Sequence, residues 1–177
     1  MHIVFETQRL ILRRFTEEDA PLIYRLTSDP EVLHYVHEPT LENEAQAKDI
    51  LTNIILPQYK LNLGRWAIHT KPDQQFIGWC GLKYIEKTGI IDLGYRLLKM
   101  AWGKGYATEA AQHTLSYGLH DLKIELITGR AHIENKASLK VLEKIGMKFS
   151  KNEIADGCPV KTYTISLQDL PGFVKQK

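Results

Sequence analysis

The sequence has few of the features that mark a specialised class of protein. It contains only two cysteines, Cys80 and Cys158, which lie far apart and have no metal-ligand spacing. We therefore expect buried thiols in a reducing compartment, with neither a disulfide nor a bound metal. Charged residues interrupt every hydrophobic run before it reaches membrane-spanning length, and no basic-then-apolar leader opens the chain. These absences predict a cytoplasmic protein that does not enter a membrane.

A strong charge of one sign is also missing. The chain has 23 Lys and Arg against 21 Asp and Glu, a formal net charge of +2, and its basic residues are scattered. This balance gives no case for a nucleic-acid partner. The 177 residues, 44% of them hydrophobic, suffice for the core of one domain. No repeat, linker or low-complexity tract divides the chain.

The hydrophobic pattern predicts an α+β order, with antiparallel hairpins first and one strand–helix–strand crossover after them. Strands are expected at residues 9–15, 66–70, 76–86, 90–98 and 124–131, and near Lys148 and Tyr163. Helices are expected at 16–27, at 42–56 and at 136–145, with Pro57 interrupting or ending the second of these. A short helix is expected to begin at Asp29, and another is expected to run from the glycine-rich segment through Leu119.

The most informative segment is Trp102-Gly103-Lys104-Gly105-Tyr106-Ala107-Thr108-Glu109-Ala110. A glycine-rich turn that opens a helix leaves several backbone N–H groups without partners, at the positive end of the helix dipole. Such a helix start binds phosphate or diphosphate, provided that no side chain keeps the anion away. A tight turn without a ligand needs the same glycines, so the segment alone leaves both interpretations open. The P-loop pattern is absent, and the dinucleotide fingerprint lacks its third small residue at Thr108.

A second segment, from Ala131 to Gly146, combines polar residues with a predicted helix. Asn135 stands where an N-cap is expected, and Gly146 stands where a left-handed C-cap is expected. Asn135 and Ser138 are three residues apart, so their side chains share the opening face of the helix. Plain capping explains the pair, but an amide and a hydroxyl on one face also suit a ligand beside the glycine-rich segment.

Together these segments resemble the GNAT acetyltransferases, and within them the RimJ/RimL-like ribosomal-protein N-terminal acetyltransferases. The opening Thr7-Gln8-Arg9-Leu10-Ile11-Leu12-Arg13 is similar to that of the subgroup. Asp92-Leu93-Gly94-Tyr95 followed by the glycine-rich segment resembles its acetyl-CoA motif, and Asn135-x-x-Ser138 resembles its next helix. The resemblance covers residues 7–168 as one domain and leaves 169–177 as a C-terminal tail.

The resemblance implies a mixed, mostly antiparallel central sheet, splayed in the middle and flanked by helices. Acetyl-CoA would lie in the splay and on the glycine-rich segment, and the chain would work without a metal. The cofactor-binding residues implied are Leu97, Leu98, Met100, Trp102, Gly103, Lys104, Gly105, Tyr106, Ala107, Thr108, Asn135 and Ser138. Family members often carry Gln or Arg at the position of Met100, so a side-chain contact to the cofactor is not expected there.

The implied reaction moves the acetyl group of acetyl-CoA to a primary amine. Backbone N–H groups around Leu97 and Leu98 are our candidates for stabilising the oxyanion. Ser138 is the candidate for protonating the departing thiolate, and Asp92 is the candidate general base. Glu109 is expected to support the loop. The acceptor is a protein N-terminus or a small amine such as a polyamine or aminoglycoside, and a non-catalytic acyl-CoA sensor is the rival class. Either a monomer or a homodimer is compatible with the sequence.

Overall fold

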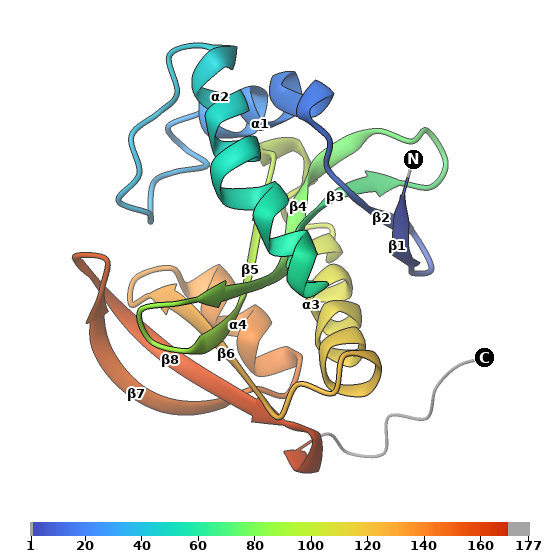
Figure 1. Ribbon diagram of the computed structural model, residues 1–177. Helices are drawn as coiled ribbons and strands as arrows, with labels where there is room; N and C mark the ends of the chain where they lie inside the picture. Colours follow the sequence, from blue (N-terminus) through green and yellow to red (C-terminus); the bar gives the residue numbers. More distant parts are fainter. Residues whose placement is uncertain (1, 170–177) are drawn as a thin grey trace.

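The computed structural model describes residues 2–169 and is built around one eight-stranded sheet in the order β1-β2-β3-β4-β5-β6-β8-β7 (Figure 1). The strands are β1 Ile3–Glu6, β2 Leu10–Arg14, β3 Gly64–Thr70, β4 Phe76–Ile85, β5 Ile90–Leu97, β6 Leu126–His132, β7 Lys148–Ala155 and β8 Cys158–Ser166. The helices are α1 Ala20–Thr27, α2 Glu44–Ile50, α3 Tyr106–Ser116 and α4 Lys136–Lys144. Neighbouring strands are antiparallel except for β5 and β6, which the α3 crossover makes parallel.

The helices cover both faces of the sheet and bury a separate core against each (Figure 1). One core joins α3 and α4 to the strands through residues such as Leu115, Leu142 and Leu93. The other joins α1 and α2 to the opposite face through residues such as Ile23 and Trp79. Successive residues of a central strand therefore point into two different environments.

The sheet is splayed between β5 and β6. Their parallel ladder consists of the pairs Asp92↔Thr128 and Leu93↔Gly129. Beyond Leu93 no pairing between these strands is found in the described part of the chain, although β5 runs on to Leu97 and β6 to His132. Backbone groups at the end of β5 are thus left without a neighbouring strand, as the family resemblance implied.

The predicted α+β order, hairpins and single crossover are confirmed, and the remaining differences have local causes. Residues 30–35 form successive turns, so the expected second helix is wrong. Among them only Leu33 is buried and Val32 is partly buried against the core, so little packing supports a helix of this length. Pro57 interrupts the helix begun by α2, since a π turn over Leu51–Ile55 leads into a 3-10 turn over Leu56–Leu61. The short edge strand β1 was not expected.

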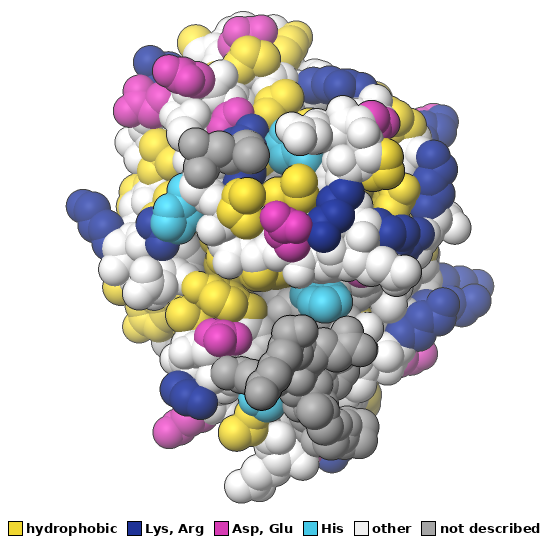
Figure 2. All heavy atoms as spheres, turned by 90° about the vertical axis from the view of Figure 1, so that its right-hand side faces the viewer, with side chains coloured by type: hydrophobic (Ala, Val, Ile, Leu, Met, Phe, Trp, Pro, Cys, Tyr) yellow, Lys and Arg dark blue, Asp and Glu magenta, His cyan; other side chains and the backbone are white. Residues whose placement is uncertain are grey.

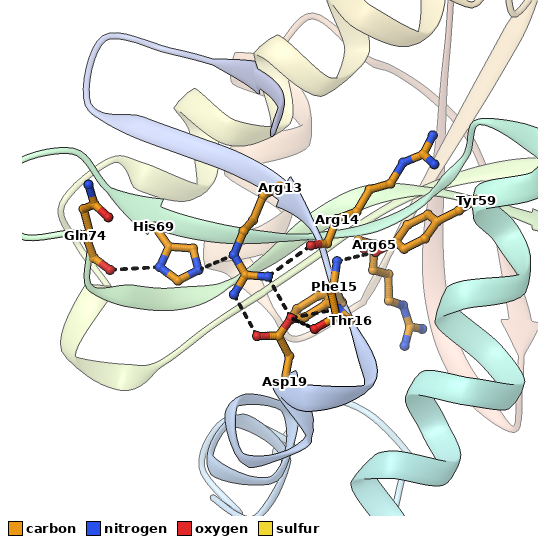
Figure 3. Close-up of polar contacts among 9 residues, drawn as sticks. All are labelled: Arg13, Arg14, Phe15, Thr16, Asp19, Tyr59, Arg65, His69 and Gln74. Atoms are coloured by element: carbon orange, nitrogen blue, oxygen red, sulfur yellow. Dashed lines mark hydrogen bonds and ion pairs between the residues drawn. The ribbon is translucent and has the colours of Figure 1, made fainter. Parts of the chain in front are cut away.

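A polar network fastens β2 to the start of α1. Figure 3 shows Arg13 turned toward Asp19, with its Nη1 and Nη2 donating to the carboxylate at 2.7 and 2.8 Å. The Nε of Arg13 lies 3.2 Å from Nε2 of His69 on β3. Asp19 also accepts from the backbone N–H of Thr16, at 2.8 Å. Burial raises the pKa of Asp19, but the Arg13 and Thr16 contacts outweigh it, and the net pKa lies below the ordinary value.

The surface over β1 and α3 is chemically mixed. Figure 2 shows apolar, basic and acidic side chains interspersed across this face. Among residues 2–169, no helix is both long enough and apolar enough to cross a bilayer.

Candidate active site

The glycine-rich segment forms an open cradle of amides before α3. After a 3-10 turn over Lys99–Ala101, Gly103 and Gly105 take φ values of 72° and 79°, a region that favours glycine. Within the described residues, no acceptor is found for the backbone N–H groups from Gly103 to Thr108, and no side chain caps the helix. These amides and the helix dipole together present positive charge to an anion.

Arg9, on the connection between β1 and β2, contacts this cradle and the first turn of α3. Its Nε donates to Glu109 at 2.6 Å, its Nη1 donates to the carbonyl of Lys104 at 3.0 Å, and its guanidinium lies 4.6 Å from the ring centre of Tyr106. Glu109 also accepts from the hydroxyl of Thr7, at 2.6 Å. The geometry therefore gives Glu109 the supporting position that the sequence suggested, and it adds a positive side chain beside the loop.

Two hollows adjoin the cradle. One of about 420 Å³ runs along α3 past Gly105, Thr108 and Gln112 to Lys144 at the end of α4. A smaller one, of about 160 Å³, lies between the loop at Lys104 and the β3–β4 turn. An extended ligand bound at the amides therefore has room on either side of the loop.

The end of β5 supplies backbone groups to the splay, but not those of Leu98. The N–H of Leu98 donates to the carbonyl of Ile77 on β4 at 2.9 Å, so it is not available to an oxyanion and that expectation is corrected. Because backbone groups alternate sides along a strand, the N–H of Leu97 points away from β4, toward the splay. The carbonyl of Leu97 accepts from Nε1 of Trp102 at 2.9 Å, which ties the strand to the glycine-rich loop.

Ser138 meets a tyrosine across the splay. Oδ1 of Asn135 accepts from the N–H of Ser138 at 3.1 Å, so the amide acts as an N-cap. The Ser138 hydroxyl lies 2.9 Å from the hydroxyl of Tyr95, which comes from β5. Burial raises the pKa of Tyr95, so its phenol stays protonated, and the same hydroxyl donates to the backbone carbonyl of Ser138 at 3.2 Å. Either hydroxyl can donate in the Tyr95–Ser138 pair, so the contact fixes where the Ser138 hydroxyl lies without fixing its proton.

Asp92 lies on the opposite face of β5 from Tyr95, because the two residues are three positions apart. Its Oδ1 accepts from Nε of Arg130 on β6 at 3.0 Å, and the two side chains are 20% and 19% exposed. Burial raises the pKa of Asp92 by more than Arg130 lowers it. Within residues 2–169 no hydrogen bond to Oδ2 is found, so one carboxylate oxygen remains for another donor.

Sequence reasoning found the cradle and the start of α4 but missed two supporting side chains. Arg9 and Tyr95 both stand within the motifs that carry the family resemblance, yet their partners lie about a hundred and about forty residues away in sequence. Trp66 and Trp79 are 1% and 6% exposed, so both belong to the core.

The geometry agrees with comparisons to known proteins. The acetyltransferase (GNAT) domain family matches residues 9–148. An uncharacterised N-acetyltransferase, p20 of Bacillus licheniformis, is 32% identical over 166 residues, which cover 91% of this chain and 93% of that protein.

Two solved structures of N-acetyltransferases that are named for different acceptors have the same fold. RimL, a ribosomal L7/L12 α-N-protein acetyltransferase solved with coenzyme A, superposes with a TM-score of 0.81 at 15% identity, covering 95% of this chain and 99% of RimL. A spermidine N-acetyltransferase from Vibrio cholerae, solved with CoA and spermine, gives 0.76 at 18% identity, covering 92% and 98%. At these identities the likeness establishes the fold but not the acceptor. The chain belongs to the GNAT acetyltransferase family and is an acetyl-CoA-dependent N-acetyltransferase.

Proposed function

We propose that the chain transfers acetyl directly from acetyl-CoA to a small primary amine while both are bound. The observation that carries this proposal is the row of unpartnered amides from Gly103 to Thr108, beside a splay lined by Leu97 and Ser138. The amides fit the diphosphate of CoA, because charge-assisted bonds to backbone N–H are strong where no side chain intervenes. The hollow that passes Thr108 gives the rest of the molecule room.

In the proposed reaction the neutral amine nitrogen attacks the thioester carbonyl and forms the N–C bond, which places negative charge on the carbonyl oxygen. The C–S bond breaks when this tetrahedral intermediate collapses. The Leu97 N–H, which points into the splay, donates to the oxyanion that develops on the carbonyl. The Ser138 hydroxyl donates a hydrogen bond to the departing sulfur, and Tyr95 orients it through the contact between the two hydroxyls. The attacking nitrogen gives up one further proton, which reaches the departing sulfur through the Ser138 hydroxyl, so the products are the N-acetylated amine and the thiol of CoA.

We propose that Asp92 receives the amine. A free amine is largely protonated at neutral pH and must lose a proton before it can attack. The unpartnered Oδ2 of Asp92 accepts a hydrogen bond from the ammonium and then its proton, directly or through water. The raised pKa of Asp92 suits that exchange better than an ordinary carboxylate would.

The surroundings of the splay support a small acceptor over the N-terminus of a folded protein. The segment between α1 and α2 reaches over to the other half of the sheet, where the rings of Tyr35 and His132 lie 5.6 Å apart. A Cβ at Gly157, in the β7–β8 turn, would lie 3.6 Å from Nδ1 of His37. These close approaches favour an acceptor smaller than a polypeptide. Membership of the RimJ/RimL-like subgroup stays a proposal, supported by the three motifs that carry the resemblance.

The test is CoA release, followed with a thiol reagent, on a panel of small primary amines and short peptides. Cys80 and Cys158 are buried, so the background from the protein should be low. We expect Ser138→Ala and Tyr95→Phe to lower kcat about 10- to 100-fold, the effect of losing one hydrogen bond in the transition state, with little change in KM for acetyl-CoA.

Ser150→Ala, at an exposed serine on β7, is the matched control and should leave kcat unchanged. If acetyl-CoA binds but no amine on the panel releases CoA, the chain is a sensor and the proposal fails. Full activity in Ser138→Ala would remove that hydroxyl from the mechanism.

A further inference from the structure

We infer that the acceptor amine also carries an anionic oxygen group, a carboxylate or a phosphate, which Arg65 and Lys83 bind on the α1/α2 face of the sheet. The inference rests on the proposed transfer to a small amine. It adds the chemical class of that amine, and its basis is two cationic side chains near Asp92 that have no ion-pair or hydrogen-bond partner within residues 2–169.

The strand register gathers these side chains on one face. Arg65 of β3 pairs with Gly81, Lys83 of β4 pairs with Asp92, and Trp79 pairs with Arg96. Since alternate residues of a strand share a face, these charged side chains and the ring of Trp79 all lie opposite Tyr95 and Ser138. An acceptor amine that approaches from this face of the sheet meets the acetyl-CoA bound on the opposite face.

The arginines are held by the ring of Trp79. The guanidinium of Arg65 lies 4.4 Å from the ring centre, and that of Arg96 lies 5.6 Å from it. The ring itself lies over Gly94, where a Cβ would come within 3.2 Å of it. Stacking on a buried aromatic fixes the direction of a guanidinium without using its hydrogen-bond donors.

The acids of this face are already engaged. Glu38 accepts from Nη2 of Arg96 at 2.8 Å, and Asp92 accepts from Arg130. Among residues 2–169, the side chains of Arg65 and Lys83 have no ion-pair or hydrogen-bond partner. Asp156 and Glu153 also act on the cations of this face, but within the described residues neither forms an ion pair with Arg65 or Lys83. The donors of these two cations therefore remain available.

The local electrostatics agree with a missing anion. Burial, and then repulsion from Arg96, lower the pKa of Arg65 to about 10. Burial and the neighbouring Arg65 likewise lower the pKa of Lys83, although Asp92, Asp156 and Glu38 act against this. Glu38 and Asp92 also act against the lowering of the Arg65 pKa, but less than burial and Arg96 favour it. A bound carboxylate or phosphate would relieve this repulsion and satisfy the Arg65 fork with paired hydrogen bonds. A polyamine would add further positive charge to the same place.

The test compares amines that differ only in charge. The panel contains ω-amino carboxylates of increasing length, aminoalkyl phosphates, uncharged n-alkylamines and diamines, each assayed for kcat/KM. We expect kcat/KM for one of the anionic series to be about 10- to 100-fold higher than for the matched alkylamines, because the anion accepts hydrogen bonds from charged side chains. Whether the carboxylates or the phosphates prevail identifies the anion.

Arg65→Gln should lower the kcat/KM ratio of anionic amines over alkylamines to about one, and Arg65→Lys should retain part of this preference. Lys87→Gln, in the exposed β4–β5 turn, removes the same charge far from the splay and should retain all of it. The unfolding midpoint of each variant is measured alongside.

Binding of the N-acetylated products to the CoA-bound protein gives a second readout that needs no turnover. Preferential binding of anionic products, lost in Arg65→Gln, supports the anion site even if transfer is never seen, and in that case only the proposed transfer fails. Transfer to alkylamines or diamines at equal or higher kcat/KM, or a preference unchanged in Arg65→Gln, overturns the inference and leaves the transfer standing.

Discussion

Replacing Gly103 by alanine should weaken CoA binding far more than it weakens the fold. Gly103 has a φ of 72°, and a Cβ built there would meet no atom within 4 Å. The substitution therefore costs only the strain of a left-handed alanine, about 1–2 kcal/mol of unfolding free energy. The new methyl group stands among the amides from Gly103 to Thr108, where the diphosphate oxygens must approach.

The chain offers a matched control for this strain. Gly89, in the β4–β5 turn, has a φ of 69° and is equally free of neighbours within 4 Å of a Cβ. Gly89→Ala should thus lose the same roughly 1–2 kcal/mol of stability. Its CoA affinity should be unchanged because the turn lies at the opposite end of β5 from the splay.

The magnitude follows from the bonds at risk. A hydrogen bond to a charged group contributes about 1.5–3 kcal/mol, so losing one raises the Kd roughly 10- to 150-fold. Calorimetric titration with CoA and urea unfolding of both variants separate binding from stability. Equal CoA affinities in Gly103→Ala, Gly89→Ala and the parent protein would show that the diphosphate does not lie on these amides.

Three further predictions follow from individual contacts. Arg9→Met should raise the Kd for CoA about 5- to 30-fold. The Arg9 side chain is 44% exposed, so losing its ion pair with Glu109 should lower the unfolding free energy, measured in urea, by less than about 1 kcal/mol. Asp19→Asn should cost about 2 kcal/mol at neutral pH. Because folding lowers the pKa of Asp19, its stabilisation is present above the unfolded pKa and is lost as the pH falls, so urea midpoints of the variant and parent should converge in acid. Burial raises the pKa of Cys80 to about 12, so a thiol reagent should titrate it only after unfolding.

Local sequence signals predicted the parts of this site that local chemistry determines. The amide cradle follows from two glycines before a helix, and the Asn135 cap follows from its place before a helical pattern. The crossover between β5 and β6 follows from the order of the elements. In each case the residues that cooperate are neighbours in the chain, and the pattern contains all of them.

The parts that the sequence did not reveal depend on register between strands and on distant contacts. Tyr95 meets Ser138 only because β5 and α4 flank the same splay, and Arg65 meets Trp79 only through the pairing of β3 with β4. A one-residue slip in either strand would turn each side chain to the other face. The correction at Leu98 has the same origin, since the choice between its amide and that of Leu97 depends on which residues face β4.

The splay explains how one strand can serve two substrates. β4 satisfies alternate backbone groups of β5, while those of Leu97 and Tyr95 face the place where β6 has diverged. Adjacent side chains of the same strand diverge as well: Tyr95 points to Ser138 under α4, and Arg96 points to Glu38 on the opposite face. A donor bound on the α3 side and an amine arriving from the α1 side therefore meet at the edge of β5 without competing for the same side chains. Closing the ladder between β5 and β6 would satisfy the Leu97 amide with a carbonyl and separate the two faces, so a fully paired sheet would gain hydrogen bonds and lose the reaction.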